Sequence, residues 1–307
     1  MIEQSLFWSV IAALAWLAYA VAAALLLAGL RRKLRARLQG RVGPPIWQPV
    51  LDLVKLMYKK PTVPESSSPA FLAAPAVALA SSALAAVLVP AAPDHQLSFT
   101  GDLVLLPVLL FAGEAALVFG GFFSGNPYAW ISASRSLNIA LSREAFLVLA
   151  LISLYIRSEK LALAQAIGGI PPPHALLLFA FFTIFLLFSS FTTLFSAPLA
   201  ETEILEGYLL EYSGPLLALA ELSHWLMSYT VAGIASAAAL SALGLWKLGV
   251  LAPLLHLSVI VLLAFLLACI DAIFARLRIW GTVKLVVITL GILSFTCLVV
   301  GVARWWL

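Results

Sequence analysis

Residues 6–30 read LFWSVIAALAWLAYAVAAALLLAGL, and residues 31–33, Arg-Arg-Lys, follow at once. An uncharged apolar run of this length can cross the hydrocarbon core of a bilayer as a helix, which takes about 20 residues. Basic residues directly after such a run mark the side of the membrane on which the chain remains. We predict a membrane-spanning helix here. A cleaved signal peptide would have a positively charged start and a shorter apolar core, whereas Glu3 makes this start acidic.

The same pattern continues along the chain. Of its 307 residues, 63% are hydrophobic and 10% are charged, whereas soluble domains have about 25% charged residues. This composition excludes a soluble globular protein and a disordered one. We expect an all-α integral membrane protein, a single transmembrane domain over residues 1–307. The eight predicted spans are 6–30, 70–92, 102–123, 138–156, 175–196, 216–243, 251–272 and 283–306.

The basic residues predict the orientation of these spans. If the N-terminus lies outside, 14 of the 18 Lys and Arg residues fall on the inner side and four on the outer side. Because inner loops carry the excess of Lys and Arg, we expect both termini outside and a multi-pass protein of the cytoplasmic (inner) membrane. The net charge of +4 then reflects topology, and we expect lipid and no nucleic acid as a partner.

Residues 43–60, GPPIWQPVLDLVKLMYKK, are too short and too polar to span a bilayer. Val50 and Met57 fall at helical spacing on one face, while Asp52 and Lys55 fall on the other. This pattern predicts an amphipathic helix on the inner surface. The turn before it contains Arg41, Gly43 and Pro44, and proline fixes φ and removes a donor, so the preceding helix must end there.

Ionisable residues inside the predicted spans are the best candidates for function, because each costs a few kcal/mol at the centre of a membrane helix. Glu114 lies near the middle of the third span, and Glu144 lies in the inner part of the fourth. Glu221 and His224 share a face of the sixth span, and Asp271 ends the seventh. We predict that these five residues form a proton relay.

The alternative is that the same residues are neutral or paired and serve only helix packing. For Glu221 and His224 the two interpretations have equal support. Asp271 is also explained as the partner of an arginine nearby, because Arg276 and Arg278 follow it closely.

The loop after the fifth span is acidic on a side that should be positive. Four of the 14 acids of the chain fall within 11 residues, at Glu201, Glu203, Glu206 and Glu211. A solvated acidic loop is the simpler interpretation, since acids contribute little to topology. Opposite charges on neighbouring inner loops would instead build a semi-buried polar layer. We therefore predict a coupling loop that receives an electrostatic change from a docked partner.

The two cysteines give no metal site. Cys269 and Cys297 lie in apolar runs without zinc-ligand or iron–sulfur spacing. They lie roughly 21 Å apart in depth along their spans, and a disulfide needs Cα atoms within about 7 Å. We expect free thiols.

Four groups of residues resemble the NuoH family, the membrane subunits of complex I and of energy-converting (group 4) [NiFe] hydrogenases. They are Arg41-Val42-Gly43-Pro44 with Leu51–Leu56, Phe119–Gly121 with Ser132–Arg135, Leu141–Glu144, and Ala200–Glu203 with Glu206-Gly207 and Glu211–Gly214. The last group is the most specific match. The resemblance extends over nearly the whole chain and implies eight spans with both termini outside.

The branch of the family follows from the departures. Quinone-reducing members usually carry a Pro-Phe-Asp stretch where this chain reads Leu194-Phe195-Ser196, and Leu199 replaces the first glutamate of their acidic cluster. Asp271, followed by Ala275-Arg276-Leu277-Arg278, resembles the hydrogenase branch. The sequence is therefore most similar to the formate hydrogenlyase or membrane-bound hydrogenase type. A quinone-site subunit of complex I is the alternative, and a sulfur-reducing relative also fits.

The resemblance implies a membrane-anchor and ion-coupling subunit without catalytic residues. Its expected partners are hydrogenase-like large and small subunits and an iron–sulfur subunit on the inner face, with antiporter-like membrane subunits beside it. The chain would bind no cofactor, since the nickel–iron site and the iron–sulfur clusters belong to those partners. The residues expected at the partner interface are Arg41, Gly43, Pro44, Asp52, Lys55, Arg135, Arg276 and Arg278. Among them, Arg135 should pair with a loop carboxylate.

Two other functional classes are alternatives to a complex subunit that couples ions. A stand-alone secondary transporter usually has broken helices or an inverted repeat, for which Gly120-Gly121 and Gly168-Gly169 are weak signals and no repeat is visible. A purely structural anchor needs no ion path, and Glu114 near the midplane argues against it.

Overall fold

The computed structural model describes residues 2–303 apart from 94, 96, 191, 197–206 and 249–250, with the side chains of 2–7 and 193 also left out. It is helical, as predicted, and its described part contains no strand. The α-helices are α1 (Ile2–Leu38), α2 (Gln48–Met57), α3 (Pro69–Val87), α4 (Asp102–Phe122), α5 (Pro127–Ser158), α6 (Leu163–Gly168), α7 (Pro172–Ser189), α9 (Gly214–Ala242), α10 (Ala252–Ile273) and α11 (Ile279–Val302). Short 3₁₀ segments are η1 (Thr193–Phe195), η3 (Gly207–Glu211) and η4 (Leu245–Lys247).

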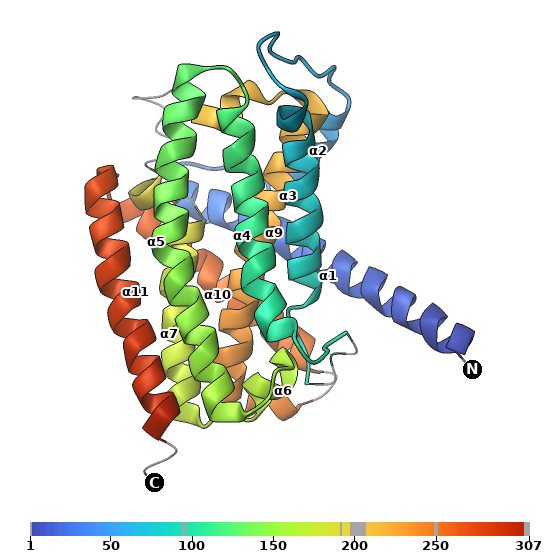
Figure 1. Ribbon diagram of the computed structural model, residues 1–307, viewed down its shortest axis with the longest axis vertical. Helices are drawn as coiled ribbons and strands as arrows, with labels where there is room; N and C mark the ends of the chain where they lie inside the picture. The colour runs from blue at the N-terminus through green and yellow to red at the C-terminus, as the bar shows by residue number, and fades with distance from the viewer. Residues whose placement is uncertain are drawn as a thin grey trace.

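The long helices form one bundle. Figure 1 shows α3, α4, α5, α7, α9, α10 and α11 running along the long axis of the molecule, while α1 crosses at a steep angle and its N-terminal end projects away. Within the described residues, eight helices are long and apolar enough to cross a membrane. The chain is therefore a multi-pass membrane protein, and the eight-span prediction is confirmed.

Three span boundaries differ clearly from the predicted ones. Helix α1 continues to Leu38 rather than ending at residue 30. Helix α5 begins at Pro127 rather than residue 138, because Asn126 caps it by accepting a hydrogen bond from the backbone N–H of Tyr128 at 2.9 Å. Proline also suits the first turn of a helix, where its missing N–H is no loss. Helix α7 ends at Ser189 and not at residue 196. Apolar runs thus located the spans, while their ends follow from capping and from polar partners.

Helix α9 is the centre of the bundle. In its most apolar stretch, 89% of the residues are buried, against 22% for α1. Its second half, residues 231–242, reads VAGIASAAALSA, and small residues let neighbouring helices approach closely. The core therefore lies around α9, with α3, α7, α1 and α10 packed against it.

The predicted amphipathic helix is present as α2, and the turn before it packs on the end of α1. Gly43 has φ +73°, and a Cβ there would lie 2.7 Å from the Cβ of Ala36, so only glycine fits this left-handed and crowded position. Val54 and Met57 are about half exposed on the outer face of α2. These exposed apolar side chains fit the predicted amphipathic pattern.

Helix α4 is continuous through Gly120 and Gly121, so these glycines do not mark a broken helix. A side chain at Gly120 would collide with the hydroxyl of Tyr212, and a Cβ at Gly121 would lie 2.7 Å from the Cβ of Tyr208. The two glycines make room for these two tyrosines, which lie in and directly after η3. Both cysteines, at 269 and 297, are free, as predicted.

Candidate functional site

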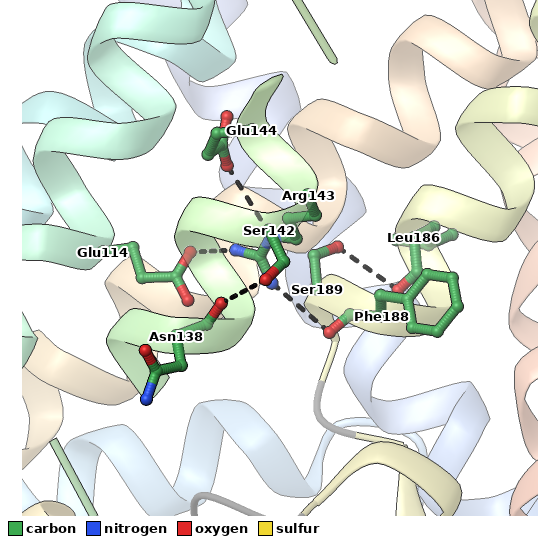
Figure 2. Close-up of polar contacts among 8 residues, drawn as sticks. All are labelled: Glu114, Asn138, Ser142, Arg143, Glu144, Leu186, Phe188 and Ser189. Atoms are coloured by element: carbon green, nitrogen blue, oxygen red, sulfur yellow. Dashed lines mark hydrogen bonds and ion pairs between the residues drawn. The ribbon is translucent and has the colours of Figure 1, made fainter. Parts of the chain in front are cut away.

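Three ionisable side chains meet where α4 packs against α5, and we call them the buried cluster: Glu114 on α4 with Arg143 and Glu144 on α5. Arg143 forms an ion pair with Glu114, and their side chains are 5% and 8% exposed. Its Nε also lies 3.6 Å from a carboxylate oxygen of Glu144. Figure 2 shows the guanidinium of Arg143 reaching towards Glu114 while Glu144 lies on its other side.

Arg143 also caps α7. Its Nη1 donates a hydrogen bond to the carbonyl of Phe188 at 3.3 Å (Figure 2). The last carbonyls of a helix lack intrahelical partners and carry partial negative charge, so a cation there is favourable. Arg31 of α1 does the same from another side, with Nη1 donating to the carbonyl of Ser190 at 2.7 Å. These contacts explain why α7 stops at Ser189.

The buried cluster leaves little room for water. The cavity beside it measures about 20 Å³, which is room for about one water molecule. In the described structure, Oε2 of Glu144 and Nε of Arg143 are buried without a hydrogen-bond partner. An unsatisfied buried polar atom costs about 1–3 kcal/mol, and such atoms call for a functional or structural reason.

A larger cavity of about 250 Å³ lies nearby, and we call it the arginine cavity. Its polar lining residues are Arg31, Arg32, Arg35, Ser190, Glu221, His224, Ser228 and Asp271. Arg31 forms an ion pair with Asp271 at 2.6 Å. Asp271 therefore has an arginine partner, as its alternative interpretation holds, but that partner includes Arg31 on α1, 240 residues away in the sequence.

His224 lies at both the buried cluster and the arginine cavity. It lines both the small cavity beside the buried cluster and the arginine cavity. Glu221, one turn earlier on α9, lines only the larger of these two cavities. The structure thus brings the five predicted relay residues into two neighbouring cavities with one shared imidazole. Whether they conduct protons is a matter for proposal.

The acidic loop is described only in part. Glu201, Glu203 and Glu206 lie outside the described residues. Glu211 is half-buried in η3, where its carboxylate accepts a hydrogen bond from Nδ2 of Asn126, the N-cap of α5. The end of the predicted coupling loop is therefore attached to the start of the helix that carries Arg143.

The predicted interface residues lie on helices as well as in loops: Asp52 and Lys55 are on α2 and Arg135 is on α5. Asp52 forms an ion pair with Arg32 at 2.6 Å, and Lys55 lies nearby on α2. Arg41 is exposed in the turn after α1 and donates to the side chain of Gln39. Pro44 follows Gly43 in that turn, Arg135 and Arg276 are half-buried, and Arg278 is the exposed N-cap residue of α11.

Sequence reasoning missed three residues of this site. The sequence pattern assigns Arg143 no role of its own, and it marks Arg31 only as one of the basic residues that set the orientation of the first span. Tyr208, which lines the small cavity, carried no signal at all. Burial raises the pKa of Tyr208 to about 12, so it keeps its proton at neutral pH and can only donate or accept hydrogen bonds as a neutral hydroxyl. The positive charge of Arg143 inside a span was the available signal.

Comparison with known proteins decides the family. The sequence pattern of the family described as NADH dehydrogenase matches residues 10–302. The chain belongs to the NADH dehydrogenase family. Its members include NuoH-type subunits, so the resemblance found in the sequence is confirmed.

Relatives of two kinds are similar to this member of the NADH dehydrogenase family. The H subunit of NADH-quinone oxidoreductase from Thermomicrobium roseum is 31% identical over 214 residues, 60% of this chain and 63% of the relative. Hydrogenase-4 component C from Escherichia coli is 32% identical over 204 residues, 64% of each chain. The chain thus spans a little under two thirds of these relatives. An H subunit of NADH-quinone oxidoreductase from Syntrophobacter fumaroxidans is 29% identical, with 81% of each chain covered.

The fold is also found in a solved structure. A chain of the membrane-bound sulfane sulfur reductase, an archaeal respiratory membrane complex, superimposes with a TM-score of 0.82. The match covers 95% of this chain and 98% of that chain at 24% identity. The NADH dehydrogenase family fold is therefore shared with subunits of respiratory membrane complexes, of quinone-linked and hydrogenase-linked types alike.

Proposed function

We propose that the chain is the membrane-anchor and ion-coupling subunit of a membrane-bound [NiFe]-hydrogenase-type respiratory complex. It would link electron transfer in peripheral subunits to translocation of protons or sodium ions. The observation that carries this proposal is the buried cluster of Glu114, Arg143 and Glu144, connected through His224 to the arginine cavity. A structural anchor has no need of two carboxylates held around one arginine in a nearly dry site.

The charge balance of the buried cluster explains how it can carry a proton. Two ionised carboxylates and one guanidinium leave one net negative charge, which is costly in a dry site. One bound proton neutralises the cluster, and the two carboxylates then share that proton as a coupled pair. The unpaired Oε2 of Glu144 is an available position for it. His224 is the group that can pass the proton on to Glu221 or Asp271.

The coupling step would enter from the acidic loop. Glu211 is bonded to Asn126, which caps α5, and α5 carries Arg143. A change of charge in a docked partner would shift this loop, and thereby the position of Arg143 between its two carboxylates. Such a device needs an element with two arrangements that the partner biases. The pairings of Arg143 with Glu114 and with Glu144 supply them.

The hydrogenase branch of the proposal rests on residues of this chain. Leu194-Phe195-Ser196 and Leu199 depart from the quinone-reducing pattern, while Asp271 and the Ala275–Arg278 run resemble the hydrogenase branch. No group of three or more His, Cys, Asp or Glu residues that could hold a metal occurs in the described part of the chain. Nickel–iron and iron–sulfur chemistry would belong to large, small and iron–sulfur subunits on the inner face, with antiporter-like subunits alongside. Both termini would lie on the outer side of the inner membrane.

A quinone-site subunit of a complex I-type enzyme is the second candidate. The arginine cavity favours it, because both apolar residues (Ala24, Leu27 and Leu267) and polar ones (His224 and Asp271) line the cavity, which would suit an amphipathic headgroup. The similarity to the H subunit of NADH-quinone oxidoreductase is as strong as that to hydrogenase-4 component C. A purified complex that reduces a short-chain quinone and neither forms nor oxidises hydrogen would favour this candidate.

The test of ion coupling is Glu114→Gln and Glu144→Gln in the complex reconstituted into liposomes. Glutamine keeps the shape and can still hydrogen-bond but cannot exchange a proton. Because proton transfer by a positioned side chain contributes about 10²–10⁴-fold to a rate, we expect substrate-linked ion transport to fall by about tenfold or more, with normal assembly. Glu65→Gln is the matched control, since Glu65 is exposed in the loop before α3.

The result that rejects the relay is equally direct. If both variants retain turnover and ion transport at the level of Glu65→Gln, the buried cluster serves packing alone. Glu201→Gln and Glu203→Gln extend the test to the coupling loop, where we expect turnover without full ion transport.

A further inference from the structure

A second cavity of about 220 Å³ lies between α2 and α9, and it borders the arginine cavity, with which it shares the lining residues Arg32, Glu221 and Trp225. We call the two together the basic groove. Its charged residues are Arg31, Arg32, Arg35, Lys55 and Lys59 against Asp52, Glu221 and Asp271. Five cations face three acids, so the basic groove has a net positive charge of two.

The excess charge can be assigned to particular side chains. Arg31 pairs with Asp271 and Arg32 pairs with Asp52, both at 2.6 Å. Arg35, Lys55 and Lys59 remain together with the acid Glu221, and none of these three cationic side chains has a polar partner in the described part of the chain. Unpaired cations that line a cavity beside a membrane surface attract anions, since each Lys or Arg near an anionic surface is worth about 1 kcal/mol.

The groove is also fixed in shape. The segment after α2 is attached to the start of α9, because the backbone N–H of Thr62 donates to Oγ of Ser213 at 2.6 Å and Oγ of Ser213 is 2.9 Å from the carbonyl of Thr62. The two lysines are therefore held beside α9 by the chain itself. A site that is already formed loses less entropy when it binds its ligand.

Apolar side chains around the basic groove would suit a lipid. The outer face of α2 exposes Leu51, Val54 and Met57 at helical spacing, each about half exposed. Apolar Leu217 and Trp225 line the groove itself. An amphipathic helix of this kind lies at the boundary between headgroups and acyl chains, and basic pockets between membrane helices bind anionic headgroups.

From these observations we propose that the basic groove binds the phosphodiester headgroup of an anionic glycerophospholipid, with Arg35, Lys55 and Lys59 around the phosphate and the acyl chains along α2. The proposal goes beyond the ion-coupling function, although the groove includes the arginine cavity that the proposed relay uses. It concerns a ligand of the membrane itself, held where α1, α2 and α9 meet.

Native mass spectrometry of the full-length protein in detergent tests this site. After removal of bound lipid, phosphatidylglycerol and phosphatidylcholine with identical acyl chains are titrated separately. We expect preferential binding of phosphatidylglycerol, and a loss of about 30-fold in its affinity in Lys55→Gln/Lys59→Gln, since two cations are removed. Lys55→Arg/Lys59→Arg should keep the preference.

The matched control is Arg37→Gln/Lys60→Gln. It also removes two positive charges, one from the end of α1 and one from the segment after α2, but both residues are exposed and line neither cavity. Equal losses in the control and in Lys55→Gln/Lys59→Gln would overturn the proposal, as would equal binding of the two lipids. If inorganic phosphate at the same concentration displaces phosphatidylglycerol, the groove is a site for free phosphate and the lipid proposal is wrong.

Discussion

The buried cluster and the ion pair between Arg32 on α1 and Asp52 on α2 use the same residue types in opposite settings. In the buried cluster, the side chains of Arg143 and Glu114 are 5% and 8% exposed, whereas those of Arg32 and Asp52 are 47% and 33% exposed. Arg31, at 20%, lies between the other two arginines, while its partner Asp271 is 1% exposed. The arginines of these three pairs therefore differ in exposure in the order Arg143, Arg31 and Arg32.

Exposure decides what a broken pair costs. A charge that loses its partner in a dry site has no replacement, while a charge in an open cavity can turn to water. Substitutions in the Arg32–Asp52 pair should therefore cost little stability, while substitutions in the buried cluster should cost much more. Three substitutions, each of which removes one charge, test this relation between exposure and cost.

Arg143→Met should have the largest effect. It removes the cation from between Glu114 and Glu144 and leaves the carbonyl of Phe188 without its donor. Removing one partner of a buried pair costs about 3–5 kcal/mol, which we expect as a loss in the free energy of unfolding. Reversible unfolding in a detergent titration, followed by tryptophan fluorescence, measures it. The triple variant with Glu114→Gln and Glu144→Gln should recover part of this loss.

Asp271→Asn should have an intermediate effect. The amide keeps the size of the carboxylate, and Arg31 keeps its bond to the carbonyl of Ser190 at the end of α7. Losing a hydrogen bond to a charged group costs about 1.5–3 kcal/mol, and the cavity of about 250 Å³ lets water compensate, so we expect about 1.5 kcal/mol. A loss as large as that of Arg143→Met, in the same unfolding assay, would contradict this relation between exposure and cost.

Asp52→Asn should have the smallest effect. Its pair with Arg32 is about half exposed, and exposed pairs contribute at most about 1 kcal/mol. Salt screens such charges, so the difference between Asp52→Asn and the unchanged protein should disappear in 0.5–1 M salt, roughly. The effect of Arg143→Met should persist in the same salt, and equal salt sensitivity of both would show that the buried cluster is open to solvent.

The spans were predictable because a membrane helix needs a long apolar run, which any single segment displays by itself. The start of α5 was not, because residues 127–137 are polar enough to resemble a loop and only the cap at Asn126 reveals the helix. The end of α7 was missed for a related reason. Its last carbonyls bind Arg31 and Arg143, and no local pattern around Ser189 indicates partners so far away in the sequence.

The same reasoning explains why only part of the candidate site could be predicted from the sequence. A carboxylate inside an apolar run is visible at once, and Glu114 and Glu144 were found in this way. Their shared partner was not, since Glu114 and Arg143 are 29 positions apart and only the packing of α4 against α5 brings them together. Asp271 shows the converse. Two arginines nearby in the sequence suggested its partner, but the fold pairs it with Arg31 on the first helix.

The pairing of Glu114 with Arg143 has a consequence for how the protein is made. The two charges lie on α4 and α5, which follow each other directly along the chain and pack side by side. A helix that enters the membrane with a lone arginine pays about 2.5–3.5 kcal/mol at its centre. Helices α4 and α5 can instead enter together as a hairpin whose arginine is already neutralised by a glutamate. The order of these two helices in the chain thus supports insertion as well as function, and a chain with α4 deleted should fail to integrate α5.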